Sequence, residues 1–99
     1  PAVILHELAH SYHDQILGFD HPKVKNAYDR AMAAGKYKQV LLYTGRTVKH
    51  YGTTNEKEFF AEGTEAYFYR NDFYPFVAAE LQIYDPFFFQ VLKEIWGDL

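Results

Sequence analysis

Apolar residues recur every three or four positions near both ends of the chain, and this spacing constrains the fold more than any other feature. Near the start they are Leu5, Leu8, Ala9, Tyr12 and Ile16, and near the end they are Phe88, Val91, Leu92, Ile95 and Trp96. Such spacing places the side chains on one face of an α-helix. The sequence therefore predicts a first helix from about Ala2 to Leu17, closed by Gly18, and a last helix that buries its apolar stripe.

Residues that begin, end or interrupt helices mark the remaining elements. Pro22 suits the first turn of a helix and Gly35 suits its end, so a second helix is expected from about Pro22 to Ala34. Residues 39–51 contain two short β-rich runs around Thr44-Gly45-Arg46, which is typical of a hairpin. These features predict a fold that is mainly α with a small β-hairpin.

The second half of the chain is expected to be helical. Thr54 or Asn55 can cap a helix that runs to about Tyr69. The next helix would start at Asp72 or Tyr74, carry Pro75 in its first turn and end near Tyr84. The last would have Asp85 as its cap and Pro86 at its first position.

Length and composition indicate a single domain over residues 1–99. A chain of 99 residues without cysteine holds one hydrophobic core and no disulfide, and its nine Tyr and nine Phe supply large rings for that core. No apolar run approaches the ~18 residues of a membrane-spanning helix. The sequence starts at Pro1 without an initiator Met or a signal-peptide pattern, so it is expected to be part of a longer protein.

Charge is distributed unevenly around a net value of −3. Residues 21–50 carry seven Lys or Arg against one acid, whereas residues 51–99 carry three against nine. The basic stretch from Lys23 to Lys49 contains no recognised nucleic-acid motif, and a solvated basic face is the ordinary interpretation. No nucleic-acid partner is expected.

The string His6-Glu7-Leu8-Ala9-His10 is the main functional signal. Two histidines four residues apart lie one helical turn from each other, so both imidazoles can bind one metal ion. Glu7 is rotated by about 100° from His6, which places it beside the metal, where it could deprotonate a bound water. The alternative is a surface helix that carries two unrelated histidines.

A catalytic zinc usually has three protein ligands, so a third is needed. One zinc-peptidase pattern has a histidine six residues after the second, but Ile16 occupies that position here. His13 shares the helical face of His6 and His10, and it is expected to line the cleft or to lie in solvent rather than to bind the metal.

Three glutamates in the second half offer other ligands. Glu58, Glu62 and Glu65 form one helical stripe flanked by aromatic residues, which predict a largely buried helix. Like charges at this spacing repel, so a cation and its histidines would stabilise them. Spacing alone does not choose between Glu58 and Glu62 as the ligand.

Two blocks of residues carry a resemblance to a known family. The string His6-Glu7-x-x-His10, followed by Tyr51-Gly52-Thr53-Thr54-Asn55-Glu56-Lys57-Glu58-Phe59-Phe60-Ala61-Glu62, resembles the catalytic domain of the anthrax lethal factor-like zinc metallopeptidases. These are zincins whose third ligand is a glutamate on a second helix. The resemblance covers roughly residues 3–70 and implies a zincin-like metallopeptidase catalytic core in which Zn²⁺ is bound by His6, His10 and Glu58.

The resemblance also implies roles for three further residues. Glu7 would be the general base on a zinc-bound water, and Tyr51 would stabilise the oxyanion. Glu62 would not bind the zinc itself but would orient one of the residues that do. The implied partner is a peptide or protein substrate, and the implied location is extracellular. Zincins carry a β-sheet before the active-site helix, and only five residues precede His6 here. Without the edge strand of that sheet, weak activity is expected.

Two functions stay open at this point. The first is zinc-dependent peptide hydrolysis, and the second is a non-catalytic zinc-stabilised protein-interaction domain whose aromatic residues form a binding face. Glu7 favours hydrolysis, because a structural zinc needs no base beside it. His50 is expected to be exposed, and the segment from Asn71 to Trp96 is expected to pack beneath the active-site helices.

Overall fold

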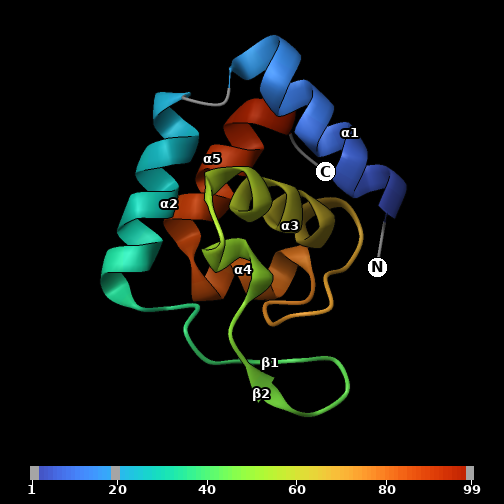
Figure 1. The fold of residues 1–99 in the computed structure, drawn as a ribbon, viewed down its shortest axis with the longest axis vertical. Helices are drawn as coiled ribbons and strands as arrows, with labels where there is room; N and C mark the ends of the chain where they lie inside the picture. The colour runs from blue at the N-terminus through green and yellow to red at the C-terminus, as the bar shows by residue number, and fades with distance from the viewer. Residues whose placement is uncertain (1–2, 19–20, 98–99) are drawn as a thin grey trace.

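Helix α3 (Glu56–Phe68) lies at the centre of the fold, and every residue from Phe59 to Tyr67 is buried. The structure is a computed structural model that describes residues 3–18 and 21–97. Helix α1 (Val3–Tyr12) crosses one side of α3, while α2 (Pro22–Ala34) and α5 (Pro86–Trp96) flank it on other sides (Figure 1). Packing is tight at Gly63, where an added Cβ would lie 2.3 Å from Cζ of Phe88.

The predicted caps and stops fix most helix ends. Gly35 ends α2 with a left-handed backbone (φ 68°), and Asp85 accepts a hydrogen bond from the backbone N–H of Phe88 at the start of α5. Helix α1 continues into a π-helical turn, η1 (His13–Leu17), which Gly18 follows. The predicted second, third and last helices are confirmed, and the first is confirmed for residues 3–17.

A small hairpin completes the mainly helical architecture, as predicted. Strand β1 (Val40–Leu41) pairs antiparallel with β2 (Thr47–Val48), and the hairpin projects at the bottom of the view in Figure 1. A short 3₁₀ turn, η2 (Tyr51–Thr53), connects it to α3. Among residues 3–18 and 21–97, no helix combines the length and the apolar character needed to cross a membrane.

The prediction for the start of the fourth helix is wrong. Helix α4 spans only Ala78–Tyr84, and Pro75 lies before it in a non-helical segment with a cis Tyr74–Pro75 bond. This segment is held by the hairpin instead, because Tyr43 N donates to Asp72 O (2.8 Å) and Tyr74 N donates to Leu41 O (2.7 Å). Long-range hydrogen bonds therefore replace the predicted first turn.

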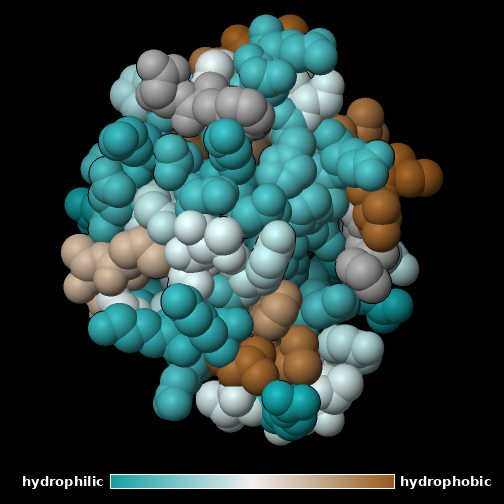
Figure 2. All heavy atoms as spheres, viewed as in Figure 1, coloured by the Kyte–Doolittle hydropathy of each residue, from teal (hydrophilic) through white to brown (hydrophobic). Residues whose placement is uncertain are grey.

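The face that α1 buries also differs from the predicted one. Leu8 and Ile16 are exposed at 59% and 66%, and Ala9 is the buried member of the predicted stripe. Figure 2 shows apolar surface along the edge of the molecule over the N-terminal half of α1. Helix α1 turns its histidines toward α3, because the acidic side chains of α3 face it there.

Two histidines expected at the surface are buried. His13 lies against Phe60 with ring centroids 4.9 Å apart, and His50 is only 5% exposed. The Nδ1 atom of His50 accepts a hydrogen bond from Gly52 N at 2.9 Å, so this side chain caps η2. Aromatic residues of the C-terminal segment pack beneath α3 as predicted, with Phe88 stacked on Phe59 at 4.0 Å.

Candidate metal centre

The two histidines of α1 face the first turn of α3. The rings of His6 and His10 lie one turn apart, with centroids 4.7 Å from each other and nearly perpendicular planes. Opposite them is Glu58, whose backbone N–H donates to the Asn55 side chain at 2.9 Å. Because Asn55 caps α3, it fixes the turn that presents the Glu58 carboxylate to α1.

Three potential ligand atoms converge at this point. Oε1 of Glu58 lies 2.8 Å from Nε2 of His6 and 3.2 Å from Nε2 of His10, and all three atoms lie within 4.8 Å of one another. A tetrahedral zinc with ligands at about 2.1 Å separates neighbouring ligand atoms by about 3.4 Å. The two imidazoles and one carboxylate are also the donor types that catalytic zinc prefers, so these residues fit the ion.

Two buried carboxylates support His6 from its other side. Its Nδ1 atom lies 2.6 Å from Oε2 of Glu65 and 3.2 Å from Oε2 of Glu62. A carboxylate that accepts a hydrogen bond from the Nδ1–H group keeps the proton on Nδ1. This leaves the Nε2 lone pair free to bind a metal and fixes the ring orientation. The sequence predicted Glu62 as the residue that orients a ligand, but Glu65 is the closer partner of His6. Glu65 lies on the same helical stripe as Glu58, and this spacing was its signal in the sequence.

The carboxylates dominate the electrostatics of the centre. Hydrogen bonds with Glu62 and Glu65 raise the pKa of His6 to about 10, against an opposing effect of burial. Burial in turn raises the pKa of Glu62, and the neighbouring Glu65 adds to that rise while His6 opposes it. The centre therefore attracts positive charge, which a proton on His6 or a metal ion can supply.

A second set of potential ligands shares His6. It comprises His6, Glu62 and Glu65, whose ligand atoms also lie within 4.8 Å of one another. Both of these carboxylates are buried, whereas His6, His10 and Glu58 are all partly exposed. The first set offers two imidazoles and is partly exposed, so it is the better candidate for a catalytic ion.

The residues expected to perform the chemistry lie in an adjoining cleft. This cleft has a volume of about 330 Å³, and it is lined by Val3, His6, Glu7, Tyr51, Glu62, Glu65, Asn71, Asp72 and Phe73. Tyr51 is 48% exposed and stands at the start of η2, while Glu7 is exposed on α1. Of the three candidate ligands His6, His10 and Glu58, His6 lines this cleft together with Glu7 and Tyr51.

The six predicted site residues thus lie in one cleft or in the candidate ligand set beside it. His6, His10 and Glu58 meet directly, Glu62 contacts His6 from behind, and Glu7 and Tyr51 line the cleft beside them. No protein-family model, curated protein or solved structure gives a significant match to the chain. The resemblance to a peptidase family consequently stays a prediction.

Proposed function

We propose that this chain is a zinc-dependent metallopeptidase core that hydrolyses peptide bonds. The observation that carries the proposal is the convergence of His6, His10 and Glu58 from two helices onto one point beside a cleft. Glu7 and Tyr51 line this same cleft, which is what a catalytic centre needs and a structural zinc site does not. The choice of peptide bonds rests on the resemblance of the sequence.

Each side chain has a distinct task in this mechanism. A zinc ion bound here would lower the pKa of a water molecule and polarise the substrate carbonyl. The Glu7 carboxylate accepts a proton from the attacking water and then passes it to the nitrogen of the leaving amine. The Tyr51 hydroxyl donates a hydrogen bond to the oxyanion of the tetrahedral intermediate. Glu65 and Glu62 accept from Nδ1 of His6 and keep the ring oriented.

The exposed apolar side chains of α1 favour a second candidate, a zinc-stabilised interaction domain. Val3, Ile4 and Leu8 are 58%, 77% and 59% exposed. Exposed apolar clusters of this kind are found at protein–protein interfaces. The two candidates differ in Glu7, because an interaction domain needs no base at that position.

The test is the substitution Glu7→Gln, with turnover of a quenched peptide and bound zinc measured on the same samples. Gln keeps both histidines in place but cannot accept the proton, so turnover should fall by about 10²-fold or more at unchanged zinc content. Tyr51→Phe removes one oxyanion donor and should cost about 10²–10³ in rate. Asp14→Asn, at an exposed carboxylate on the adjoining turn η1, is the matched control and should keep full activity.

Turnover of the unsubstituted chain is expected to be slow, because the part of the chain that the structure describes has no long edge strand beside the cleft to hold an extended peptide. The comparison between variants does not depend on the absolute rate. Undiminished turnover by zinc-loaded Glu7→Gln would contradict the mechanism and favour the interaction domain.

A further inference from the structure

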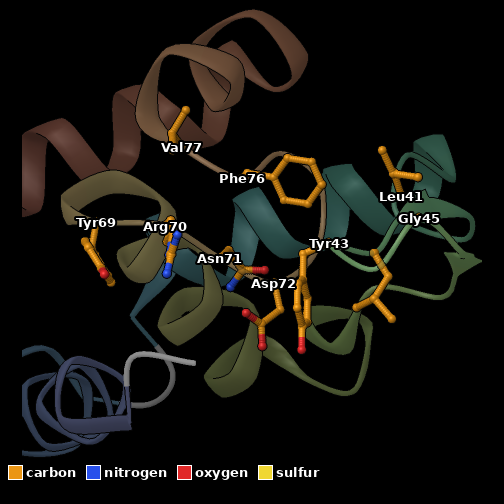
Figure 3. Close-up of a pocket in the computed structure, with 10 residues that line it drawn as sticks. Leu41, Tyr43, Gly45, Tyr69, Arg70, Asn71, Asp72, Phe76 and Val77 are labelled. Atoms are coloured by element: carbon orange, nitrogen blue, oxygen red, sulfur yellow. The ribbon is translucent and has the colours of Figure 1, made fainter.

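A cavity of about 400 Å³ lies where the end of α2 meets the segments on either side of the hairpin. Its lining residues, none of which lines the cleft of the metal centre, are Ala31, Met32, Gly35, Tyr37, Lys38, Lys49 and Thr53. A larger cavity, of about 670 Å³, lies beside the hairpin, but its charged lining residues Arg70 and Asp72 have opposite signs (Figure 3). The smaller cavity gives the clearer indication of a ligand, because its charged lining residues are both lysines.

The floor of this smaller cavity is buried and largely apolar. Ala31 and Tyr37 are only 3% and 2% exposed, and Met32 packs against the hydrophobic core. The Tyr37 hydroxyl already donates to the Asp85 carboxylate at 2.9 Å, so it needs no further partner. A floor of this kind favours the apolar body of a ligand, and the flexible thioether of methionine packs well against aromatic rings.

Two lysines form the rim of the cavity. Lys38 and Lys49 are both exposed, and neither forms an ion pair within the part of the chain that the structure describes. Lys23, in contrast, pairs with Glu94 at 2.5 Å. No acidic residue is found among the described residues that line the cavity. Two like charges on one rim give the cavity a positive potential, which favours an anion.

Hydrogen bonds hold the walls of the cavity in place. Gly35 ends α2 in a left-handed conformation, and its N–H group donates to the carbonyls of Ala31 and Met32. The two segments that flank the hairpin are joined where His50 N donates to Tyr37 O at 3.0 Å. The cavity is therefore formed before a ligand binds, and little ordering is needed on binding.

We propose that this cavity binds a small organic anion, which has an aromatic or aliphatic body and one negatively charged head group. The body lies on the floor against Met32 and Tyr37, and the head group lies between the ammonium groups of Lys38 and Lys49. Neither part of the lining alone selects this class of ligand, because the floor has no charge and exposed lysines are ordinarily solvated. The site needs no zinc and does not depend on the proposed function.

The test is a titration of the chain with 2-naphthoate, an aromatic carboxylate, followed by NMR. Met32 is the single methionine of the sequence, so its methyl group gives one resonance that reports on the floor of the cavity. We expect a saturable shift of this resonance. The neutral isostere 2-naphthamide should bind about tenfold more weakly, because it is not attracted by the two lysines. Acetate, which has the charge without the rings, should bind more than tenfold more weakly.

The role of the lysines is tested in a chain that carries both Lys38→Gln and Lys49→Gln. This chain should bind 2-naphthoate no more tightly than 2-naphthamide. Its matched control carries Lys25→Gln and Arg46→Gln, which remove the same charge at two exposed residues outside the cavity lining. The control should keep most of the preference for 2-naphthoate, because salt screens charges that lie away from the ligand.

Three results would overturn the proposal. A Met32 resonance that no 2-naphthoate concentration shifts would show that the cavity does not bind this class of ligand. Equal affinities for 2-naphthoate and 2-naphthamide in the unsubstituted chain would show that the lysines do not select an anion. A preference for 2-naphthoate that survives in the chain with Lys38→Gln and Lys49→Gln would place the anion elsewhere. All titrations are made without zinc, so failure of this proposal leaves the proposed function standing, and the reverse also holds.

Discussion

His6 contacts the carboxylates on both sides of the candidate metal centre, Glu58 on one side and Glu65 on the other. Its Nε2 atom faces Glu58 at 2.8 Å and its Nδ1 atom faces Glu65 at 2.6 Å, so both ring nitrogens have a carboxylate partner. Hydrogen bonds with Glu62 and Glu65 raise its pKa to about 10, well above the ordinary value of 6.5. When no metal is bound, His6 is therefore charged throughout the neutral range.

This charge predicts that zinc binding at pH 8 releases about one proton from His6, because the ion needs the lone pair on Nε2. Below pH 10 the folded chain holds this proton, and above that value the release disappears. A histidine with an ordinary pKa would be almost fully neutral at pH 8 and would release almost nothing. Calorimetric titrations in buffers of different ionisation enthalpy measure the number of protons directly.

The control for this measurement is Glu65→Gln, which removes the closest carboxylate from Nδ1 of His6. It lowers the pKa of His6 and should reduce the number of protons released at pH 8. Proton release near zero in the unsubstituted chain would contradict the assigned hydrogen bonds.

At the scale of elements, the packing of α3 on α5 depends on Gly63. A Cβ there would lie 2.3 Å from Cζ and 2.4 Å from Cε2 of Phe88. The substitution Gly63→Ala gains about 1 kcal/mol of helix propensity but loses about 1–3 kcal/mol through overpacking. We expect a net loss of stability, which thermal or urea unfolding of the chain measures.

The clash itself is tested by a double-mutant cycle with Phe88→Leu. Gly63→Ala should cost less in a chain that already carries Phe88→Leu, because the shorter side chain makes room for the new methyl group. A stabilising Gly63→Ala in the natural background would show that the helices can separate without cost.

Elements with local signals were predictable from the sequence. Helices α2, α3 and α5 have their ends at Gly35, Asn55 and Asp85, whose chemistry acts within a few residues. The start of α4 was not predictable, because Asp72 and Tyr74 bond to a hairpin about 30 residues earlier in the chain. The buried face of α1 was mispredicted for the same reason, since the acids that attract it belong to α3.

The candidate site also has a part that the sequence predicts and a part that it does not. The spacing of His6 and His10 is local, so the pair was visible in the motif, and structure adds the convergence with Glu58. The order of Glu62 and Glu65 around His6 was not visible, because both lie on one stripe and only the rotation of α3 against α1 decides between them.

At the scale of the whole molecule, the buried side chain of His50 makes the stability of the fold depend on pH. Burial lowers the pKa of His50 to about 4, whereas the unfolded chain keeps the ordinary value of 6.5. The unfolded state therefore binds more protons between these values, and stability is lost as the pH falls from 6.5 to 4. The loss from His50 alone is on the order of 3 kcal/mol.

The substitution His50→Asn isolates this effect. Asn can still accept the hydrogen bond from Gly52 N that caps η2, but it does not titrate. The variant should be less stable at pH 7, because aromatic contacts with Tyr37 and Phe73 are lost, and its stability should fall less steeply below pH 6.5. Chemical unfolding in the presence of a chelator gives the comparison, and parallel pH curves for the two proteins would contradict it.

We propose that one zinc ion is bound by His6, His10 and Glu58. This proposal is tested most directly by the zinc dissociation constant of the unsubstituted chain, Glu58→Ala and Glu62→Ala, each measured by competition with a chelator. Removing a ligand should weaken binding by several orders of magnitude in Glu58→Ala, whereas loss of a supporting carboxylate in Glu62→Ala should cost about 10–100-fold. Full zinc affinity in Glu58→Ala together with its loss in Glu62→Ala would place the ligand one helical turn further along α3 and contradict the assignment.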